Sequence, residues 1–277
     1  MPNSKLAAKM PKMLYGTAWK KERTSALVTT ALEAGFRGID TACQPRHYNE
    51  PGVGEGIANA LRSGIKREDL YIQSKFTPQS GQDPQSIPYN PKDRLAKQVS
   101  TSFACSLENL RIDSLDALVL HSPLQNWDDL QEVWAAMESF ADQGLVRYLG
   151  ISNCYSLEVL QKLHAWSRVK PQILQNRFYQ ETQYDKSLRK FCHDNLITYQ
   201  SFWSLTANPH IVNSPLLSSI AERENIAKEQ VFYLFLCQIG ITPLNGTTSE
   251  EHMRDDLQAL NQKLNQDDVA QILRQID

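Results

Sequence analysis

The chain has few cysteines and no long apolar run, and each shortage excludes a class of protein. Its five cysteines are scattered and odd in number, and no pair has the spacing of metal ligands. We therefore expect reduced thiols, no bound metal and a cytoplasmic protein. No apolar run is long enough to span a bilayer, and residues 1–6 lack the apolar core of a signal peptide.

An excess of charge of either sign is also missing. Lys and Arg total 29 against 31 Asp and Glu, so the formal net charge is −2. A nearly neutral chain without charged blocks gives no indication of nucleic-acid or membrane-surface binding. We therefore expect neither kind of partner. Hydrophobic residues make up 41% of the sequence, which is enough for a sizeable core.

Short apolar segments alternate along the chain with segments of helical periodicity. The predicted strands cover residues 13–18, 36–40, 70–75, 115–120, 145–151, 172–176, 197–202 and 240–244. Apolar stripes predict helices within 91–111 and 128–143, and Gly35 and Gly144 have positions typical of helix C-caps. Regular strand–helix alternation predicts a parallel sheet. Eight such units favour an α/β fold of the (β/α)₈ TIM-barrel type, formed as a single domain over residues 1–277, with about 1–10 flexible.

Two segments interrupt this alternation. Residues 77–91 are rich in Pro, Gln, Ser and Gly, and residues 203–215 form a second long connection. Both follow predicted strands, so we place them on the face where the strands end. Long loops in compact domains are often functional lids, but a disordered surface insertion describes 77–91 equally well.

Polar residues with complementary acid–base chemistry stand where successive predicted strands end. Asp40, Lys75 and His121 each close a strand, and Tyr48 follows Asp40 in the next loop. In a βα-barrel these positions meet at one face. A free phenol has a pKa of roughly 10, and a neighbouring cation lowers it. Tyr48 could then give a proton to a carbonyl oxygen, with Lys75 held by Asp40 and with His121 orienting the substrate.

Each of these residues also has an ordinary structural explanation. Tyr48 could be a loop tyrosine, Lys75 a lysine reaching solvent, and His121 a buried histidine with satisfied hydrogen bonds. Their joint placement after consecutive strands favours an active site. Lys75 alone would also fit a Schiff-base lyase or aldolase, although Asp40 should keep the lysine charged, which argues against that chemistry.

The motifs around these residues resemble those of the aldo-keto reductases. The matching segments are Gly38-Ile39-Asp40-Thr41-Ala42, Tyr48-Asn49-Glu50, Val53-Gly54-Glu55-Gly56-Ile57, Ser74-Lys75, Leu120-His121-Ser122-Pro123, Gly150-Ile151-Ser152-Asn153 and Gly16-Thr17-Ala18-Trp19. The resemblance runs from about residue 13 to about residue 260. It implies a (β/α)₈ oxidoreductase that moves hydride between NADP(H) and the carbonyl of an aldehyde or ketone, with Tyr48 as general acid/base. The partner would be a small carbonyl substrate and the protein a monomer.

The resemblance further implies contacts to the cofactor and the substrate. Ser152, Asn153 and Gln175 would hold the carboxamide, and Phe202 would stack on the nicotinamide. The whole expected cofactor set is Gly16, Thr17, Ala18, Asp40, Ser152, Asn153, Gln175, Phe202, Trp203, Ser204, Leu205, Asn245, Gly246, Thr247, Thr248, Glu251, His252 and Asp255. The expected substrate pocket is Trp19, Phe76, Ser122 and Trp203, although core packing explains the aromatic residues equally well.

Two departures from the family pattern bear on function. Asp40 and Tyr48 stand eight positions apart, more than is common in the family. The extra Gln44-Pro45-Arg46 would have to bulge outward, for which Pro45 suits a rigid turn. Because a displaced Tyr48 would lose its role, a non-catalytic cofactor-binding regulatory or structural relative is the alternative.

The second departure lies in the segment expected to bind the cofactor phosphate. Leu244 follows Pro243 where a lysine is common, and His252 stands at the position of a common arginine. Thr248 and Glu251 have the spacing of a capping box, which predicts a helix N-terminus that offers backbone N–H groups to a phosphate. Thr247, Ser249 and Arg254 are further candidates there. We expect NADP(H), with NAD(H) or dual use as the second choice.

Overall fold

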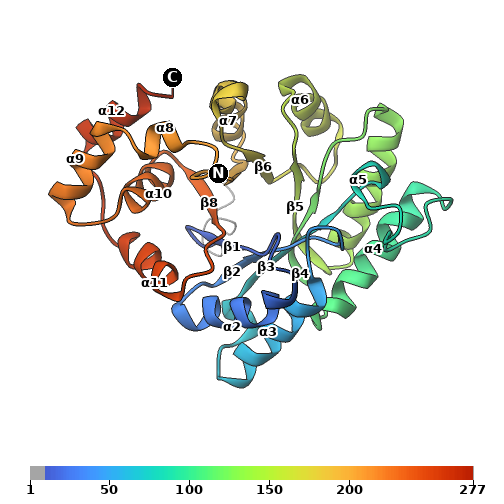
Figure 1. The fold of residues 1–277 in the computed structure, drawn as a ribbon. Helices are drawn as coiled ribbons and strands as arrows, with labels where there is room; N and C mark the ends of the chain where they lie inside the picture. The colour runs from blue at the N-terminus through green and yellow to red at the C-terminus, as the bar shows by residue number, and fades with distance from the viewer. Residues whose placement is uncertain (1–9, 277) are drawn as a thin grey trace.

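The computed structural model describes residues 10–276, and within them the chain forms a closed barrel of parallel strands surrounded by helices (Figure 1). The strands are β1 Leu14–Gly16, β2 Gly38–Asp40, β3 Tyr71–Phe76, β4 Leu115–Leu120, β5 Val146–Ser152, β6 Ile173–Arg177, β7 Thr198–Phe202 and β8 Ile241–Asn245. Each pairs with its sequence neighbours, and β1 pairs with β8 to close the barrel. The predicted (β/α)₈ fold is confirmed. Flexibility is expected for about residues 1–10, and residues 1–9 lie outside the part of the chain that the structure describes.

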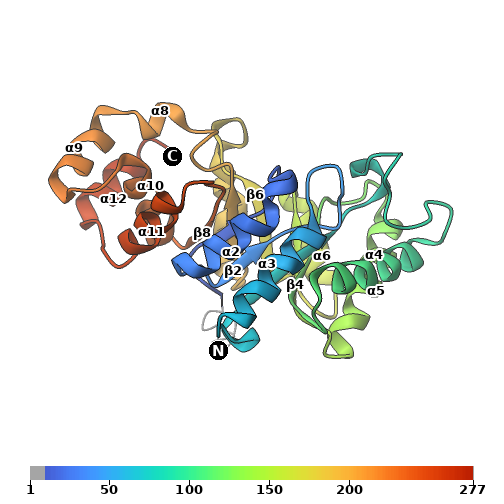
Figure 2. The same cartoon turned by 60° about the horizontal axis from the view of Figure 1, so that its bottom comes forward.

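The helices follow the strands in the order that the sequence predicts. They are α2 Thr24–Ala34, α3 Glu50–Arg62, α4 Leu95–Leu110, α5 Trp127–Asp142, α6 Leu157–Trp166, α7 Lys186–Asp194, α8 Pro209–Val212, α9 Pro215–Glu224, α10 Lys228–Gln238, α11 Glu250–Ala259 and α12 Gln266–Leu273. Helices α8 to α12 gather on one side of the barrel, whereas α2 and α3 cover β2 (Figures 1 and 2). No helix among the described residues is both long and apolar enough to span a membrane.

Apolar stripes and glycines explain how the helical layer packs. Val99, Phe103 and Leu110 of α4 are buried, and the ring of Phe103 stacks on Phe140 of α5 at 4.1 Å between centroids. Gly35 ends α2 with a φ of 118°, as its position predicts. In α3, a Cβ on Gly54 would lie 2.1 Å from the carbonyl oxygen of Asn109, so only glycine lets α3 approach α4 this closely.

The loop at 77–91 is folded against the face where the strands end. The Tyr89 hydroxyl donates to the carbonyl of Thr77 at 2.8 Å. Gln82 donates to the carbonyl oxygens of Cys43 and Thr77, and Gln44 donates to the carbonyl of Gly81. These contacts tie the loop to the β2–α3 connection, so it is not a disordered insertion. The segment 203–215 contains the short helix α8.

Candidate active site

A cleft of about 1070 Å³ opens at the C-terminal ends of the strands. It brings together most of the residues that the sequence singles out. Those lining it are Gly16, Ala18, Trp19, Asp40, Tyr48, His121, Ser122, Ser152, Asn153, Gln175, Phe202, Trp203, Ser204, Leu205, Asn245, Gly246, Thr247, Glu251, His252 and Asp255. Parallel strands direct their carboxyl ends to one side of a barrel, which explains why residues so distant in sequence meet here.

A buried ion pair lies at the base of the cleft. The Nζ of Lys75 is 2.6 Å from Oδ2 of Asp40 and also donates to the carbonyl of Thr41 at 2.9 Å. Burial alone would lower the pKa of Lys75, but the attraction of Asp40 and a hydrogen bond with it raise that pKa above its ordinary value, with Tyr48 adding to the rise. Lys75 is therefore a charged ammonium, which disfavours a Schiff-base role.

Amide side chains inside the barrel hold the other oxygen of Asp40. Oδ1 accepts hydrogen bonds from Gln73 at 2.7 Å and from Gln175 at 2.9 Å. Both amides also donate to Oε1 of Gln200 at 2.8 Å, and Tyr71 donates to Gln73. A carboxylate with this many donors has one fixed orientation, so the position of Lys75 is fixed as well.

The insertion before Tyr48 coils outward, as the proline predicts. His47 and Tyr48 both donate their backbone N–H to the carbonyl of Gln44, and Pro45 and Arg46 are exposed. The turn absorbs the extra residues. The ring of Tyr48 consequently lies near Lys75, whose Nζ is 5.1 Å from the ring centroid, and edge-on to His121 at 5.9 Å between centroids.

The pKa of Tyr48 departs from the sequence expectation of a lowered value. Burial raises this pKa most, the charge of Lys75 lowers it, and Asp40 raises it again, so the net direction is upward. Lys75 acts in the expected sense, but burial outweighs it. The hydroxyl is therefore protonated at neutral pH, which is the form of a proton donor.

His121 is held as a neutral imidazole. Its Nδ1 lies 2.7 Å from the hydroxyl of Thr77. Burial lowers the pKa of His121 well below its ordinary value, and the charges of Lys75 and His47 lower it further. A neutral ring carries one N–H and one lone pair, and the hydroxyl of Thr77 can accept or donate to fix which nitrogen bears the proton.

Polar groups expected to hold a carboxamide lie at the end of β5, directly after it and on β6. The Ser152 hydroxyl donates to the carbonyl of Gln175 at 2.6 Å. The Asn153 amide donates to the carbonyl of His121 at 2.8 Å, and its backbone has a φ of 52°. Asn153 tolerates this left-handed conformation, which turns the chain at the end of β5 and fixes these groups beside His121.

The N-terminus of α11 borders the cleft, and the predicted cap is wrong by one residue. Ser249, not Thr248, is the N-cap, and its hydroxyl accepts the backbone N–H of His252. Thr247 and Gly246 precede the cap and line the cleft. Lys20, from the loop after β1, donates its Nζ to the carbonyl of Gly246. Backbone N–H groups and a cation at one helix N-terminus suit a phosphate.

Several expected residues lie elsewhere. Phe76 is 1% exposed and packs against Tyr89 rather than lining the cleft, because neighbouring strand residues point to opposite faces and Lys75 takes the inner one. Thr17 is buried and donates its hydroxyl to the carbonyl of Asp40. Thr248 and Arg254 do not line the cleft, and Arg254 instead pairs with Glu250 along α11.

Sequence reasoning missed several polar residues that line the cleft, among them Lys20, Thr77 and Arg177. Arg177 ends β6 as Lys75 nearly ends β3, so the same signal, a charged residue after a buried strand, could have found it. Lys20 directly follows the motif at 16–19. Thr77 had no distinguishing signal beyond following β3.

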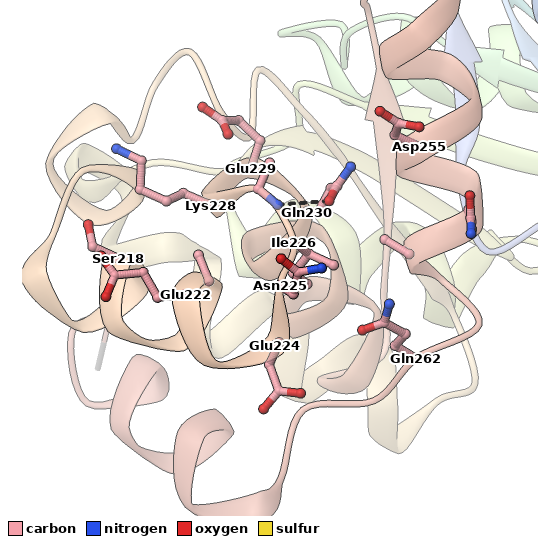
Figure 3. A pocket seen from close by; sticks show the side chains of 14 residues that line it. Ser218, Glu222, Glu224, Asn225, Ile226, Lys228, Glu229, Gln230, Asp255 and Gln262 are labelled. Carbon is pink, nitrogen blue, oxygen red and sulfur yellow. Dashed lines mark hydrogen bonds between the residues drawn. The ribbon is translucent and has the colours of Figure 1, made fainter.

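A second hollow of about 940 Å³ lies where the α9–α10 turn faces α11 (Figure 3). Its lining is mostly polar and includes Glu222, Glu224, Glu229 and Asp255. Glu229 and Asp255 also line the main cleft, so the hollow adjoins the cleft at these residues. None of the four catalytic candidates lines this hollow, and we assign the chemistry to the main cleft.

The main cleft fits a nicotinamide dinucleotide along its length. Phe202 at the end of β7 and the amide-bearing residues line the cleft, and Lys20 lies with the residues that precede the N-terminus of α11. Nε of Arg177, in the cleft wall, is buried without a hydrogen-bond partner among the described residues. An aromatic face, amide groups, helix N–H groups and cations are the groups that such a cofactor requires.

Comparisons with known proteins agree with this geometry. The family model described as "Aldo/keto reductase family" matches residues 12–276. An uncharacterized oxidoreductase, YtbE of Bacillus subtilis, is 30% identical over 88% of this chain and 81% of its own. NADPH-dependent codeinone reductase 1-2 of Papaver somniferum is 28% identical over 95% and 85%. The crystal structure of an aldo/keto reductase from Brucella melitensis superposes with a TM-score of 0.81 at 26% identity, covering 97% of this chain and 95% of that one.

Proposed function

Since the chain belongs to the aldo/keto reductase family, we propose that it reduces the carbonyl group of aldehydes or ketones, with hydride from NAD(P)H and a proton from Tyr48. The observation that carries this proposal is the position of Tyr48. Its ring lies 5.1 Å from Nζ of Lys75 despite the insertion. This supports an enzyme over a non-catalytic relative, because a displaced tyrosine would have left the ion pair without a proton donor.

Tyr48 and the ion pair have separate roles in the proposed reaction. When bound, the nicotinamide supplies the hydride. Tyr48 gives its hydroxyl proton to the carbonyl oxygen as negative charge develops there. Lys75, anchored by Asp40, stabilises the phenolate that remains. The amides of Gln73 and Gln175 keep Asp40 in place, so the positive charge is fixed before the reaction begins.

His121 orients the substrate in this proposal. The low pKa of the imidazole keeps it neutral, so it offers a hydrogen bond to the carbonyl oxygen without adding a second full charge beside Lys75. Thr77 holds Nδ1. The open side of the cleft near Trp19, Ser122 and Trp203 would take the rest of the substrate.

NADPH is the proposed cofactor, and NADH is the second candidate. The codeinone reductase is named as NADPH-dependent, which supports NADPH. Glu251 and Asp255 at the far end of the cleft favour NADH, because a carboxylate hydrogen-bonds a ribose hydroxyl and repels a 2′-phosphate. His252 also lines the cleft, and its ring N–H suits a phosphate oxygen. We also propose a monomeric state, as the family resemblance implies, and a cytoplasmic location, as the scattered cysteines indicate.

Cofactor binding and turnover test the proposal together. The purified protein is titrated with NADPH and with NADH by fluorescence. The aldehyde 4-nitrobenzaldehyde is then added and the loss of nicotinamide absorbance is followed. We expect turnover that Tyr48→Phe abolishes while cofactor binding persists, since this change removes one hydroxyl.

The alternatives give different results in the same experiment. Tight binding without turnover by any aldehyde would favour the non-catalytic relative. Turnover that survives Tyr48→Phe would show that another group donates the proton. A wild-type protein that binds neither nucleotide would reject the cofactor assignment altogether.

A further inference from the structure

Arg177 is a charged residue in the wall of the cleft to which the proposed reaction gives no role. It is the last residue of β6 and lies opposite Phe202 of β7 in the register of the sheet. Gln175, two residues earlier on the same strand, also faces the cleft. Because side chains alternate along a strand, Arg177 and Gln175 point the same way and Arg177 lies nearer the mouth.

Two aromatic rings position the guanidinium. It lies 4.3 Å from the ring of Trp203 and 5.1 Å from the ring of Tyr179. Trp203 has a φ of 57° and remains 48% exposed, so its indole forms part of the cleft surface. A planar cation on aromatic faces is held in orientation while its N–H groups remain free for a ligand.

Within the part of the chain that the structure describes, the charge of Arg177 has no ion-pair partner. Over residues 10–276, its side chain forms neither an ion pair nor a hydrogen bond, and its buried Nε is without a partner. Only its backbone N–H is engaged, by the hydroxyl of Tyr155 at 3.2 Å. A guanidinium carries five N–H donors, and burying one of them unsatisfied is costly, so the site is incomplete without an acceptor.

Hydrogen bonds link Arg177 to the reacting end of the cleft. Tyr155, which accepts its backbone N–H, contacts Oδ1 of Asn153 at 3.5 Å. Asn153 in turn donates to the carbonyl of His121. A ligand on Arg177 would therefore lie on the same side of the cleft as the groups assigned to the nicotinamide and the carbonyl. The two ligands of this cleft that carry anionic oxygens are an acidic carbonyl substrate and the pyrophosphate of the cofactor.

We propose that Arg177, held against Trp203, is an anion-binding residue of the cleft that takes carboxylate or phosphate oxygens. Guanidinium and carboxylate or phosphate groups pair through two parallel hydrogen bonds, which would satisfy Nε together with a terminal nitrogen. The assignment of the anion to substrate or cofactor rests on the proposed function, whereas the anion site itself does not.

Matched variants distinguish the two sources of the anion. Arg177→Met removes the charge at similar length, and Arg177→Lys keeps the charge but loses the planar fork. Arg274→Met, an exposed arginine that does not line the cleft, controls for net charge. For each protein we would measure the dissociation constants of NADPH and NADH, and KM for 4-carboxybenzaldehyde and 4-nitrobenzaldehyde.

Either of two patterns supports the proposal. If the substrate supplies the anion, Arg177→Met raises KM for 4-carboxybenzaldehyde about tenfold and leaves KM for 4-nitrobenzaldehyde unchanged. If the cofactor supplies it, the same variant weakens NADPH and NADH binding by equal factors of about ten, since both contain the pyrophosphate. Folded Arg177→Met protein with none of these constants altered overturns the proposal.

A readout without turnover separates this inference from the proposed function. Inorganic pyrophosphate and benzoate are titrated into the wild-type protein while tryptophan fluorescence is followed, and Trp203→Phe identifies the signal of the stacked ring. We expect a saturable change that Arg177→Met abolishes and Arg274→Met retains. This result would support the anion site even if aldehydes were not reduced. No saturable change with either anion, together with unaltered cofactor binding in Arg177→Met, rejects it.

Discussion

The imidazole of His47 packs on the indole of Trp19, with ring centroids 4.0 Å apart. The backbone N–H of Trp19 also donates to the carbonyl of His47 at 2.7 Å. These contacts join the loop after β1 to the inserted turn that immediately precedes Tyr48. The turn that lengthens the β2–α3 connection is therefore held in place by the loop after β1.

Removing the indole should reduce catalysis more than stability. Trp19 is 57% exposed, so Trp19→Ala should leave the melting temperature nearly unchanged. Without the indole, His47 loses its packing partner, so the turn can move and displace Tyr48. A displacement of about 1 Å can cost up to about 100-fold in rate. We expect kcat to fall about tenfold with unchanged cofactor affinity. Arg46→Ala, on the exposed side of the same turn, serves as the control, and an equal loss of kcat there would contradict this explanation.

The Asp40–Lys75 pair should respond asymmetrically to substitution. Asp40→Asn leaves a buried ammonium without its counter-ion, which typically costs about 3–5 kcal/mol. Lys75→Met leaves a carboxylate that still accepts from Gln73 and Gln175, so its loss should be smaller. Urea denaturation gives both free energies of unfolding. The Asp40→Asn/Lys75→Met double variant should be more stable than Asp40→Asn alone, and a double variant with additive losses would show that the pair is not coupled.

The pH profile should reflect a protonated tyrosine and a neutral histidine. The pKa of Tyr48 is raised above its ordinary value and that of His121 is lowered well below its own. Both groups are therefore in the proposed reactive form from about pH 7 to about pH 9, given their ordinary values of roughly 10 and 6.5. We expect kcat/KM for reduction to be flat over this range, while alcohol oxidation, which needs the deprotonated tyrosine, increases with pH.

A titration near the ordinary histidine value would contradict this profile. Suppose that kcat/KM for reduction decreased at pH values below about 6.5 and that His121→Asn removed this decrease. The pKa of His121 would then have its ordinary value. A break that persists in His121→Asn would have another origin. Measuring cofactor affinity over the same range separates effects on binding from effects on the proton transfer.

Gly54 should be among the least replaceable residues of the helical layer. A Cβ there would lie 2.1 Å from the carbonyl oxygen of Asn109 and 2.8 Å from Cα of Leu110, and both are backbone atoms that cannot rotate away. Gly54→Ala should therefore lower the free energy of unfolding by about 1–3 kcal/mol. Gly246→Ala, whose Cβ would meet only Nζ of Lys20 at 3.9 Å, should be nearly neutral. Equal losses would mean that α3 shifts freely on α4.

The strands could be predicted because their signal is local, but the path of the loops could not. Several apolar runs end at a polar residue that lines the cleft, as at Asp40, Ser152 and Asn245. The N-cap of α11 was misplaced because Thr247, Thr248 and Ser249 all carry hydroxyls. The choice among them depends on Asn245, which accepts the N–H of Thr247 and sets the path of the chain.

Contacts between side chains that are distant in the sequence could not be predicted either. The sequence favoured a lowered pKa for Tyr48 because it shows the cation but not the depth of burial. Phe76 is a candidate for the cleft as an aromatic residue, yet its position next to Lys75 on β3 directs it to the opposite face. The amide cluster of Gln73, Gln175 and Gln200 joins three strands. The spacing of these residues along the chain does not predict that they meet.

Gln175 performs two tasks with one amide group. It donates to Asp40 and thereby steadies the ion pair, and it also forms part of the cleft wall where the carboxamide is expected. A ligand that contacts this part of the wall therefore contacts Gln175, the side chain that also holds Asp40 and, through it, Lys75. If the cofactor binds there as proposed, Gln175 and Asp40 couple its binding to the position of Lys75, and a change at this wall reaches the ion pair beside Tyr48.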